Sequence, residues 1–230
     1  MSNVVSPDLN RGERIGLDEA ILCDSKSDAD LVHILDGAIE GDHSLLLTRL
    51  SEVSFGRFPV NIRKKIDYDP VSKTGFLGPL RALSDTALVA IVTAGTSDNP
   101  VAREASRTLR HAGEPSVSFD DLGVAGLWRI LEKESKLHTY PVVIVVAGMD
   151  GALFSVIGGL VPSTIIAVPT SVGYGAARRG ETALAVALAS CAPGIVTVNV
   201  DNGYGAACAA LPRRCSSRRY WADRCISWDR

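Results

Sequence analysis

No charge of one sign dominates this chain. Its 24 lysine and arginine residues are balanced by 26 aspartate and glutamate residues, which leaves a net charge of −2. A nearly neutral chain has no global electrostatic attraction to nucleic acid or to an anionic membrane surface, so we expect neither as a partner. With 46% hydrophobic and 22% charged residues, the composition is typical of an ordinary globular protein.

Signals for export and for cysteine-based frameworks are also missing. The N-terminus lacks the basic start and following apolar stretch of a secretory signal. The five cysteines are odd in number and include no CxxC pair, so the sequence indicates neither a disulfide framework nor a zinc ribbon. These absences predict a cytoplasmic protein with free thiols.

One stretch, residues 151–168, carries no charge over nearly the length of a membrane span. It contains three glycines and Pro162. A buried helix followed by a strand of a parallel sheet has the same appearance in sequence. We therefore predict a helix and a strand here rather than a membrane segment.

From residue 85 onward, apolar runs alternate with glycine-rich turns and helical periods. The apolar runs occupy residues 87–94, 116–122, 141–147, 164–169 and 195–200. Strands that alternate with helices predict an α/β fold with a three-layer, doubly wound parallel sheet. The runs lack polar alternation, which indicates that helices cover both faces of the sheet.

The rest of the chain differs in composition. Residues 1–84 combine a helical period around Leu31 and Leu35 with short strand-like runs, which predicts a small α+β or arm-like region. We place its boundary with the sheet domain, residues 85–210, at Ser84–Asp85. Residues 211–230 form an atypical tail rich in arginine, tryptophan and cysteine.

The loops that follow the predicted strands are the expected ligand site, because ligands of such sheets bind at the carboxyl ends of the strands. These loops contain neither a GxGxxG fingerprint nor a GxxxxGK[ST] loop. They do contain Asp98, Asp150 and Asp201. Asp98 precedes Asn99-Pro100 and fits a helix cap, whereas Asp150 precedes a wholly apolar helix and is a candidate for acid–base chemistry.

The four histidines, His33, His43, His111 and His138, all lie outside these loops. This placement disfavours a Ser-His-Asp or Cys-His nucleophile pair. Cys191 ends an apolar helix period just before Pro193-Gly194. It has two interpretations, a core residue or a nucleophile, and the partial negative charge at a helix C-terminus disfavours a thiolate there.

Several motifs in order resemble those of the LarB family of nickel-pincer cofactor biosynthesis proteins, the pyridinium-3,5-biscarboxylic acid mononucleotide synthases. The resemblance runs from about Asp8 to Cys208 and rests on IDYDPVSKTGFLG, VTAGTSDNPVAREA, DLGVAGLWRIL, VVIVVAGMDGALFSVIGGL, IIAVPTSVGYG and SCAPGIVTVNVDNGYGAA. It implies a main domain similar to aminoimidazole ribonucleotide carboxylase/mutase.

The resemblance implies that nicotinic acid adenine dinucleotide is carboxylated with CO2 on its pyridinium ring and hydrolysed to release AMP. Cys191, in the family's SCAPG motif, would add to the electron-poor ring. The resulting enamine would then attack CO2, and a carboxylate would remove the ring proton. The family places a glutamate in VAGMEGA, where this chain has the shorter Asp150.

The same resemblance implies nucleotide binding by the strand-end loops, with no tightly bound organic cofactor. The implied binding residues are Thr96, Ser97, Asp98, Gly148, Thr170, Ser171, Gly173, Tyr174 and Gly175. Asp201 would help to hold Mg2+ at the phosphoanhydride. Assembly into a homo-octamer is expected.

Two alternatives remain open at the level of sequence. One is a carboxyaminoimidazole ribonucleotide mutase, whose chemistry uses a histidine near the substrate and does not need Cys191. The other is a non-catalytic nucleotide-binding module in which Cys191 fills the core and Asp150 is a turn residue. The tail after Ala210 departs from the family's ending.

Overall fold

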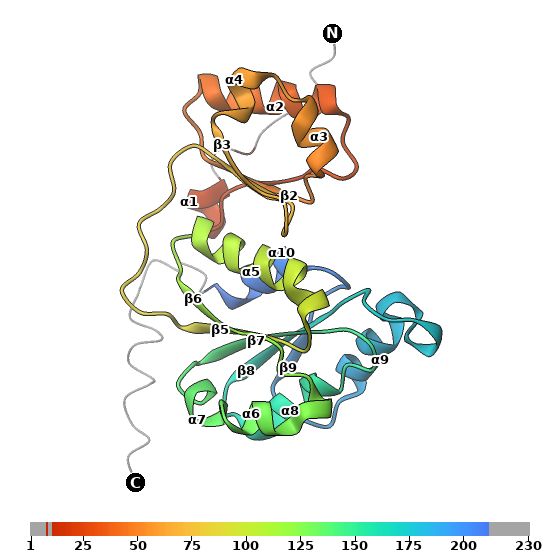
Figure 1. Ribbon diagram of the computed structural model, residues 1–230. Coiled ribbons are helices and arrows are strands. Elements are labelled where there is room, and N and C mark those ends of the chain that lie inside the picture. The colour runs from red at the N-terminus through yellow and green to blue at the C-terminus, as the bar shows by residue number, and fades with distance from the viewer. Residues whose placement is uncertain (1–7, 9–10, 212–230) are drawn as a thin grey trace.

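The computed structural model describes Asp8 and residues 11–211, which form two β-sheets joined by residues 78–88 (Figure 1). The joining segment contains no helix or strand, and the predicted boundary at Ser84–Asp85 lies within it. Apart from Leu211, the predicted tail lies outside the described residues.

The N-terminal sheet has the strand order β1-β2-β4-β3. β1 and β2 are parallel, and the remaining pairs are antiparallel. Its strands are β1 (Ala20–Leu22), β2 (Leu45–Thr48), β3 (Ile66–Asp69) and β4 (Thr74–Leu77). Its helices are α1 (Arg11–Ile15), α2 (Asp28–Glu40), α3 (Glu52–Arg57) and α4 (Val60–Arg63). Leucines and isoleucines of α2 pack with those of β2 in a core of their own, so this region is more than an arm.

The second sheet has five strands, all parallel, in the order β6-β5-β7-β8-β9. Its strands are β5 (Val89–Thr93), β6 (Ser116–Phe119), β7 (Val142–Ala147), β8 (Thr164–Pro169) and β9 (Ile195–Thr197). Helices flank the sheet on both faces, which confirms the predicted α/β class (Figure 1).

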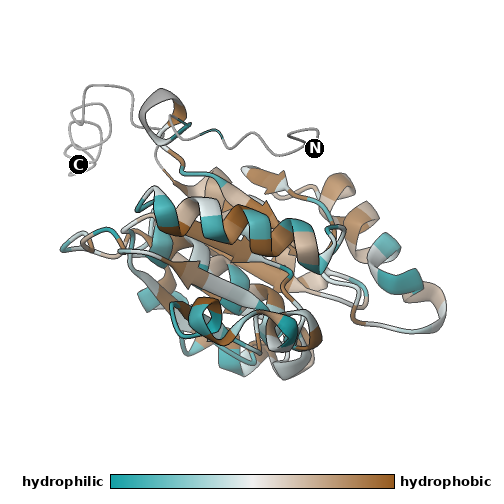
Figure 2. Cartoon of the chain, turned by 90° about the horizontal axis from the view of Figure 1, so that it is seen from above, coloured by the Kyte–Doolittle hydropathy of each residue, from teal (hydrophilic) through white to brown (hydrophobic). Residues whose placement is uncertain are grey.

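Alternate residues of each strand serve different layers, as the two-residue repeat of a strand requires. Val89 and Ile91 face α5 (Asn99–His111) and α10 (Gly203–Ala210), whereas Ala90 and Val92 face the opposite helices. The opposite layer contains α6 (Leu127–Leu131), α7 (Glu134–Leu137), α8 (Ala152–Leu160) and α9 (Glu181–Ala189). Figure 2 shows the resulting concentration of hydrophobic residues on the strands, with hydrophilic residues on the outer sides of the helices.

The uncharged stretch 151–168 divides into α8 and β8, as predicted. Within the described part of the chain, none of the helices combines the length and the apolar character needed to cross a bilayer.

Helix α5 holds the two sheets together, because it lies between them (Figure 1). Arg103 donates to the carboxylate of Asp69 in the N-terminal sheet over 2.7 Å, and the Arg107 guanidinium lies 3.9 Å from the centre of the Phe76 ring. Burial alone would raise the pKa of Asp69, but hydrogen bonds from Arg103 and Ser72 outweigh it and lower that pKa to about 2. These contacts fix the loops of the N-terminal sheet over the carboxyl ends of the second sheet.

Candidate functional site

The carboxyl ends of β5, β8 and β9 bring four predicted residues together as two hydrogen-bonded pairs. Thr170 donates its hydroxyl hydrogen to Asp98 Oδ1 over 2.7 Å, and the Ser171 amide donates to Asp201 Oδ1 over 2.8 Å. Asp201 lies close enough to Asp98 for its negative charge to disfavour ionisation of the Asp98 carboxyl, which helps to raise the pKa of Asp98. The structure therefore assembles Asp98, Thr170, Ser171 and Asp201 at one edge of the sheet.

Asp98 is a buried member of this group, with only 4% of its surface exposed. Burial raises its pKa above the ordinary value, although hydrogen bonds from Thr170 and from the Gly95 amide oppose the shift. The predicted helix-cap role for Asp98 is wrong. Asp98 has helical dihedrals at the end of the turn Thr96–Asp98, and its side chain bonds back to Gly95 instead of capping α5.

Gly148 permits a close approach between the loops that follow β7 and β8. A Cβ atom at this position would lie 2.3 Å from the Val172 carbonyl oxygen and 2.7 Å from Thr170 Oγ1. The Met149 amide donates to the Val172 carbonyl over 2.9 Å. This contact brings the loop of Asp150 alongside Val172, while the Asp150 carboxylate is exposed and accepts a 3.3 Å hydrogen bond from the Ala152 amide.

The other predicted binding residues lie in the flanking loops, and Ser97 also lines the cleft described below. Thr96 and Ser97 are exposed at the start of α5. The loop after Ser171, which carries Gly173, Tyr174 and Gly175, runs outward beside α9 (Figure 1). Tyr174 is 81% exposed. A Cβ atom at Gly173 would lie 3.5 Å from the Met149 Cα atom, so the start of this loop adjoins the loop of Asp150.

Cys191 lies in the loop before β9, whereas Asp150 lies in the loop after β7. In a parallel sheet, loops that precede strands lie at the amino ends of the strands, and loops that follow strands lie at the opposite, carboxyl ends. Within one chain, the two predicted catalytic residues therefore lie apart. The Cys191 side chain is exposed, so the interpretation of Cys191 as a core residue is wrong.

A cleft of about 690 Å³ lies between the N-terminal sheet and the carboxyl ends of the second sheet. Such a volume falls in the range of small-molecule sites. The second sheet and α5 contribute Ser97, Pro100, Val101, Glu104, Ser171, Val172 and Asp201. The N-terminal region contributes Cys23, Asp24, Lys26, Asp28, Arg49, Ser51, Val53, Ser54, Arg57, Val71, Ser72 and Lys73.

Glu104 was not predicted as a site residue, because in sequence it reads as one polar position of a helix. It is 5% exposed, and its carboxylate accepts a 3.2 Å hydrogen bond from the Tyr204 amide at the start of α10. Burial raises its pKa, while hydrogen bonds from the Tyr204 and Gly203 amides oppose the shift. Glu104 thus joins α5 to α10 directly beneath the cleft.

The N-terminal wall was also missed. Most of its polar residues lie in segments that follow strands, namely DSKSD (24–28), RLS (49–51) and the β3–β4 turn, whereas Ser54 and Arg57 lie in α3. Their position after strands could have identified them, because the same criterion selected the candidate loops of the second sheet. No three histidine, cysteine, aspartate or glutamate side chains gather into a metal-binding group within the described residues.

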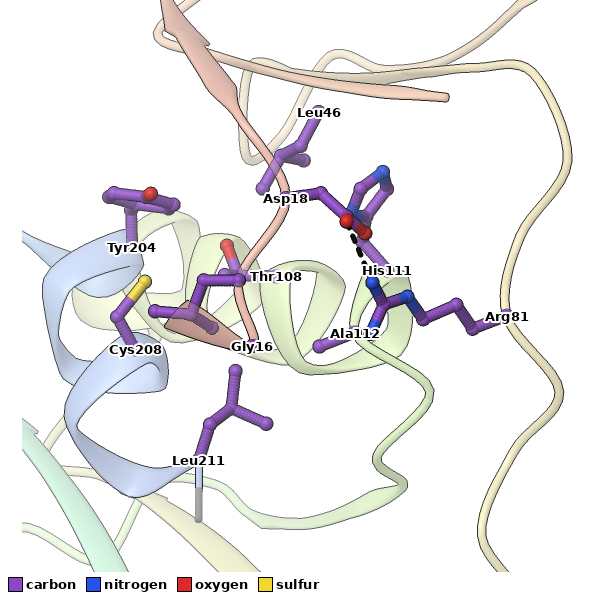
Figure 3. Close-up of a pocket in the computed structure, with 11 residues that line it drawn as sticks. Gly16, Asp18, Leu46, Arg81, Thr108, His111, Ala112, Tyr204, Cys208 and Leu211 are labelled. Carbon is purple, nitrogen blue, oxygen red and sulfur yellow. Dashed lines mark hydrogen bonds and ion pairs between the residues drawn. The ribbon is translucent and has the colours of Figure 1, made fainter. Parts of the chain in front are cut away.

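A second cavity, of about 20 Å³, lies between the N-terminal region, α5 and α10 (Figure 3). It has room for about one water molecule. Figure 3 shows His111 beside the ion pair of Arg81 and Asp18, with Tyr204 and Cys208 on the other side. Because this cavity is too small for a substrate, the larger cleft is the candidate ligand site.

Two comparisons place this chain among known proteins. Residues 2–78 match the family model for the LarB/PurE-like N-terminal domain. The chain is also 33% identical, over 211 residues, to an uncharacterized protein of Methanocaldococcus jannaschii. That match covers 86% of this chain and 79% of the archaeal protein.

Proposed function

Because this chain belongs to the LarB/PurE-like family, which suggests a carboxylase-like or mutase-like activity, we propose that it is a carboxylase and hydrolase of nicotinic acid adenine dinucleotide. The products are pyridinium-3,5-biscarboxylic acid mononucleotide and AMP, made for a nickel-pincer cofactor. The observation that carries the proposal is the cleft at the strand ends, whose volume and polar lining suit a nucleotide.

Each step of the proposed carboxylation uses a residue of this chain. The Cys191 thiolate adds to a carbon of the pyridinium ring, which forms a C–S bond and turns the ring into an enamine. The neighbouring ring carbon attacks CO2 and forms the new C–C bond. Asp150 then takes the proton from that carbon, the electron pair restores the aromatic ring, and the C–S bond breaks to release the thiolate.

This sequence of steps requires Cys191 and Asp150 at one ring, although they lie at opposite edges of the sheet in one subunit. We therefore propose that Cys191 of a second copy completes each site, within a homo-oligomer such as an octamer. The exposure of Cys191 supports this proposal, as do its exposed apolar neighbours. Leu188 in α9 is 71% exposed and Val196 in β9 is 50% exposed.

The hydrolytic step breaks the phosphoanhydride with water. Asp201 is the carboxylate at the rim that would hold Mg2+ together with the substrate's own phosphates, because Mg2+ often binds through one or two carboxylates and phosphate oxygens. When bound, the ion would neutralise charge on the phosphates. Ser171 and Thr170 keep Asp201 and Asp98 in place through their hydrogen bonds.

The mutase alternative is less well supported, because its chemistry needs a histidine near the substrate. None of the cleft-lining residues in the described part of the chain is a histidine. His111 is buried near the end of α5, beside the small cavity.

The test is mass spectrometry of the protein incubated with nicotinic acid adenine dinucleotide, bicarbonate and Mg2+. We expect the dicarboxylated mononucleotide and AMP in equal amounts, and no carboxylated product from Cys191→Ala. Folded protein that binds the dinucleotide but forms neither product would overturn the proposal and favour a non-catalytic binding module.

A further inference from the structure

Three basic residues of the N-terminal region face the cleft from three different loops. Lys26 follows β1, Arg49 follows β2, and Lys73 lies in the turn between β3 and β4. The Leu50 amide donates to the Lys73 carbonyl over 2.8 Å, which holds the second and third loops side by side. These loops share one edge of the N-terminal sheet, and that edge faces Ser171 and Asp201 across the cleft.

The acidic residues of the cleft are already engaged. Arg57 lies 3.1 Å from Asp28, which also accepts a hydrogen bond from Ser54, and Arg49 lies 3.5 Å from Asp24. Asp201 and Glu104 accept hydrogen bonds from backbone amides, as described above. Asp24 and Asp28 are thus paired with arginines, whereas Asp201 and Glu104 are hydrogen-bonded to backbone amides.

Lys26 and Lys73 are not engaged in this way. Both side chains are exposed, and among the described residues neither forms an ion pair or a side-chain hydrogen bond. Two lysine ammonium groups that border a cleft without protein partners are suited to an anionic ligand, and lysine binds phosphate as a point charge.

The backbone at this wall is also unusual. Arg49 and Lys73 both have φ of 53°, and Asp201 on the facing wall has φ of 54°. Residues other than glycine rarely adopt this left-handed conformation, which is found preferentially at ligand clamps and active sites. The Arg49 guanidinium donates to the Asp201 carbonyl over 3.2 Å and so connects the two walls.

We infer that the N-terminal region is a phosphate-binding unit, in which Lys26 and Lys73, supported by Arg49, bind the phosphate of the adenylate half of the substrate. This inference rests on the proposed function for the identity of the nucleotide. The pyridinium half then lies toward Gly148 and Asp150, whose loop adjoins the cleft at Val172. The N-terminal region thus selects substrates that carry a phosphate-linked second nucleoside.

The experiment measures AMP binding by isothermal titration calorimetry for the full chain and for Lys26→Gln and Lys73→Asn. Asparagine is chosen at position 73 because it tolerates the left-handed backbone. Lys65→Gln is the matched control, since Lys65 is an exposed lysine of the same region that does not line the cleft. Adenosine, which lacks the phosphate, is titrated in parallel.

We expect each cleft variant to bind AMP about tenfold more weakly, since each loses one charged contact to phosphate. Adenosine binding should not change in any variant, and Lys65→Gln should bind AMP like the unmodified protein. AMP affinity that is unchanged in both cleft variants, or no AMP binding by the unmodified protein, would overturn the inference.

The KM for the dinucleotide separates this inference from the proposed function. If carboxylated product forms, but Lys26→Gln and Lys73→Asn leave the KM for the dinucleotide unchanged, the phosphate-binding role fails and the activity stands. If AMP binding depends on the two lysines but no carboxylated product forms, the proposed activity fails and the binding site stands.

Discussion

Acidification should destabilise this protein through His111. This histidine ends α5 where α5 contacts the N-terminal sheet, and it is 5% exposed. Its Nε2 atom lies 3.2 Å from the Ser44 hydroxyl oxygen, and its ring centre lies 5.7 Å from that of Phe76. Asp18 and Arg81 lie beside it (Figure 3). Burial, with smaller contributions from Arg81 and Arg110, lowers the pKa of His111 to about 4, although Asp18 opposes the shift.

The size of the effect follows from the two pKa values. The folded protein keeps His111 neutral down to about pH 4, whereas the unfolded chain protonates it below the ordinary histidine pKa of 6.5. The unfolded state therefore binds more protons between these values, and stability falls as the pH falls through this window. Between pH 7 and pH 4.5, we expect a loss of about 2 to 3 kcal/mol in the free energy of unfolding from this residue.

The assay is urea unfolding at pH 7 and at pH 4.5 for the unmodified protein and for His111→Gln. Other groups also titrate, but they do so in both proteins, so the difference between the two pH dependences isolates His111. The unmodified protein should lose about 2 to 3 kcal/mol more than the variant on acidification. Equal losses in the two proteins would refute the assignment of a buried, neutral histidine.

Three further substitutions test residues of the cleft and of the neighbouring strand ends. Gly148→Ala places a Cβ atom 2.3 Å from the Val172 carbonyl oxygen, and thermal unfolding should show a loss of about 2 kcal/mol or more, as is usual for overpacking. Thr170→Val removes the hydroxyl donor of Asp98, and the free energy of unfolding in urea should fall by about 1 to 3 kcal/mol. Glu104 has a raised pKa because it is buried, so the folded state retains its proton longer than the unfolded state, and stability falls as pH rises above the unfolded pKa. Glu104→Gln should abolish this fall, so its stability relative to the unmodified protein should increase from pH 4 to pH 7 in urea unfolding. Each prediction fails if the variant unfolds like the unmodified protein under these conditions.

The second sheet was predictable because its central strands β5, β7 and β8 are buried on both faces. The apolar runs at 141–147 and 164–169 coincide almost residue for residue with β7 and β8. The run at 195–200 forms a strand only as far as Thr197. This strand, β9, is the last in the sheet and pairs with a neighbour on one side only. Long apolar runs thus located the loops that carry Asp98, Thr170 and Asp201.

The N-terminal wall was not predictable in the same way. Its short strands have few residues to show a period, and polar residues such as Lys26 and Lys73 look like solvated turns in sequence. Their meeting with Ser171 depends on α5 packing against β3 and β4, through contacts such as that of Arg103 with Asp69. Contacts between residues so far apart in the chain leave no local pattern.

The placement of Cys191, in contrast, was visible in the sequence. Cys191 precedes a predicted strand, whereas Asp98, Asp150 and Asp201 all follow strands. A parallel sheet puts these two kinds of loop at opposite edges. A shared site for Cys191 and Asp150 therefore calls for a second copy of the chain.

The most direct test of the account is complementation between two inactive variants. Cys191→Ala and Asp150→Asn carry different affinity tags, are co-expressed, and are purified through both tags so that only mixed oligomers remain. If a second copy supplies the thiol, about a quarter of the sites combine an intact Cys191 with an intact Asp150. We predict carboxylated product at about a quarter of the rate of the unmodified protein. Mixed oligomers with no more activity than either variant alone would contradict the shared site.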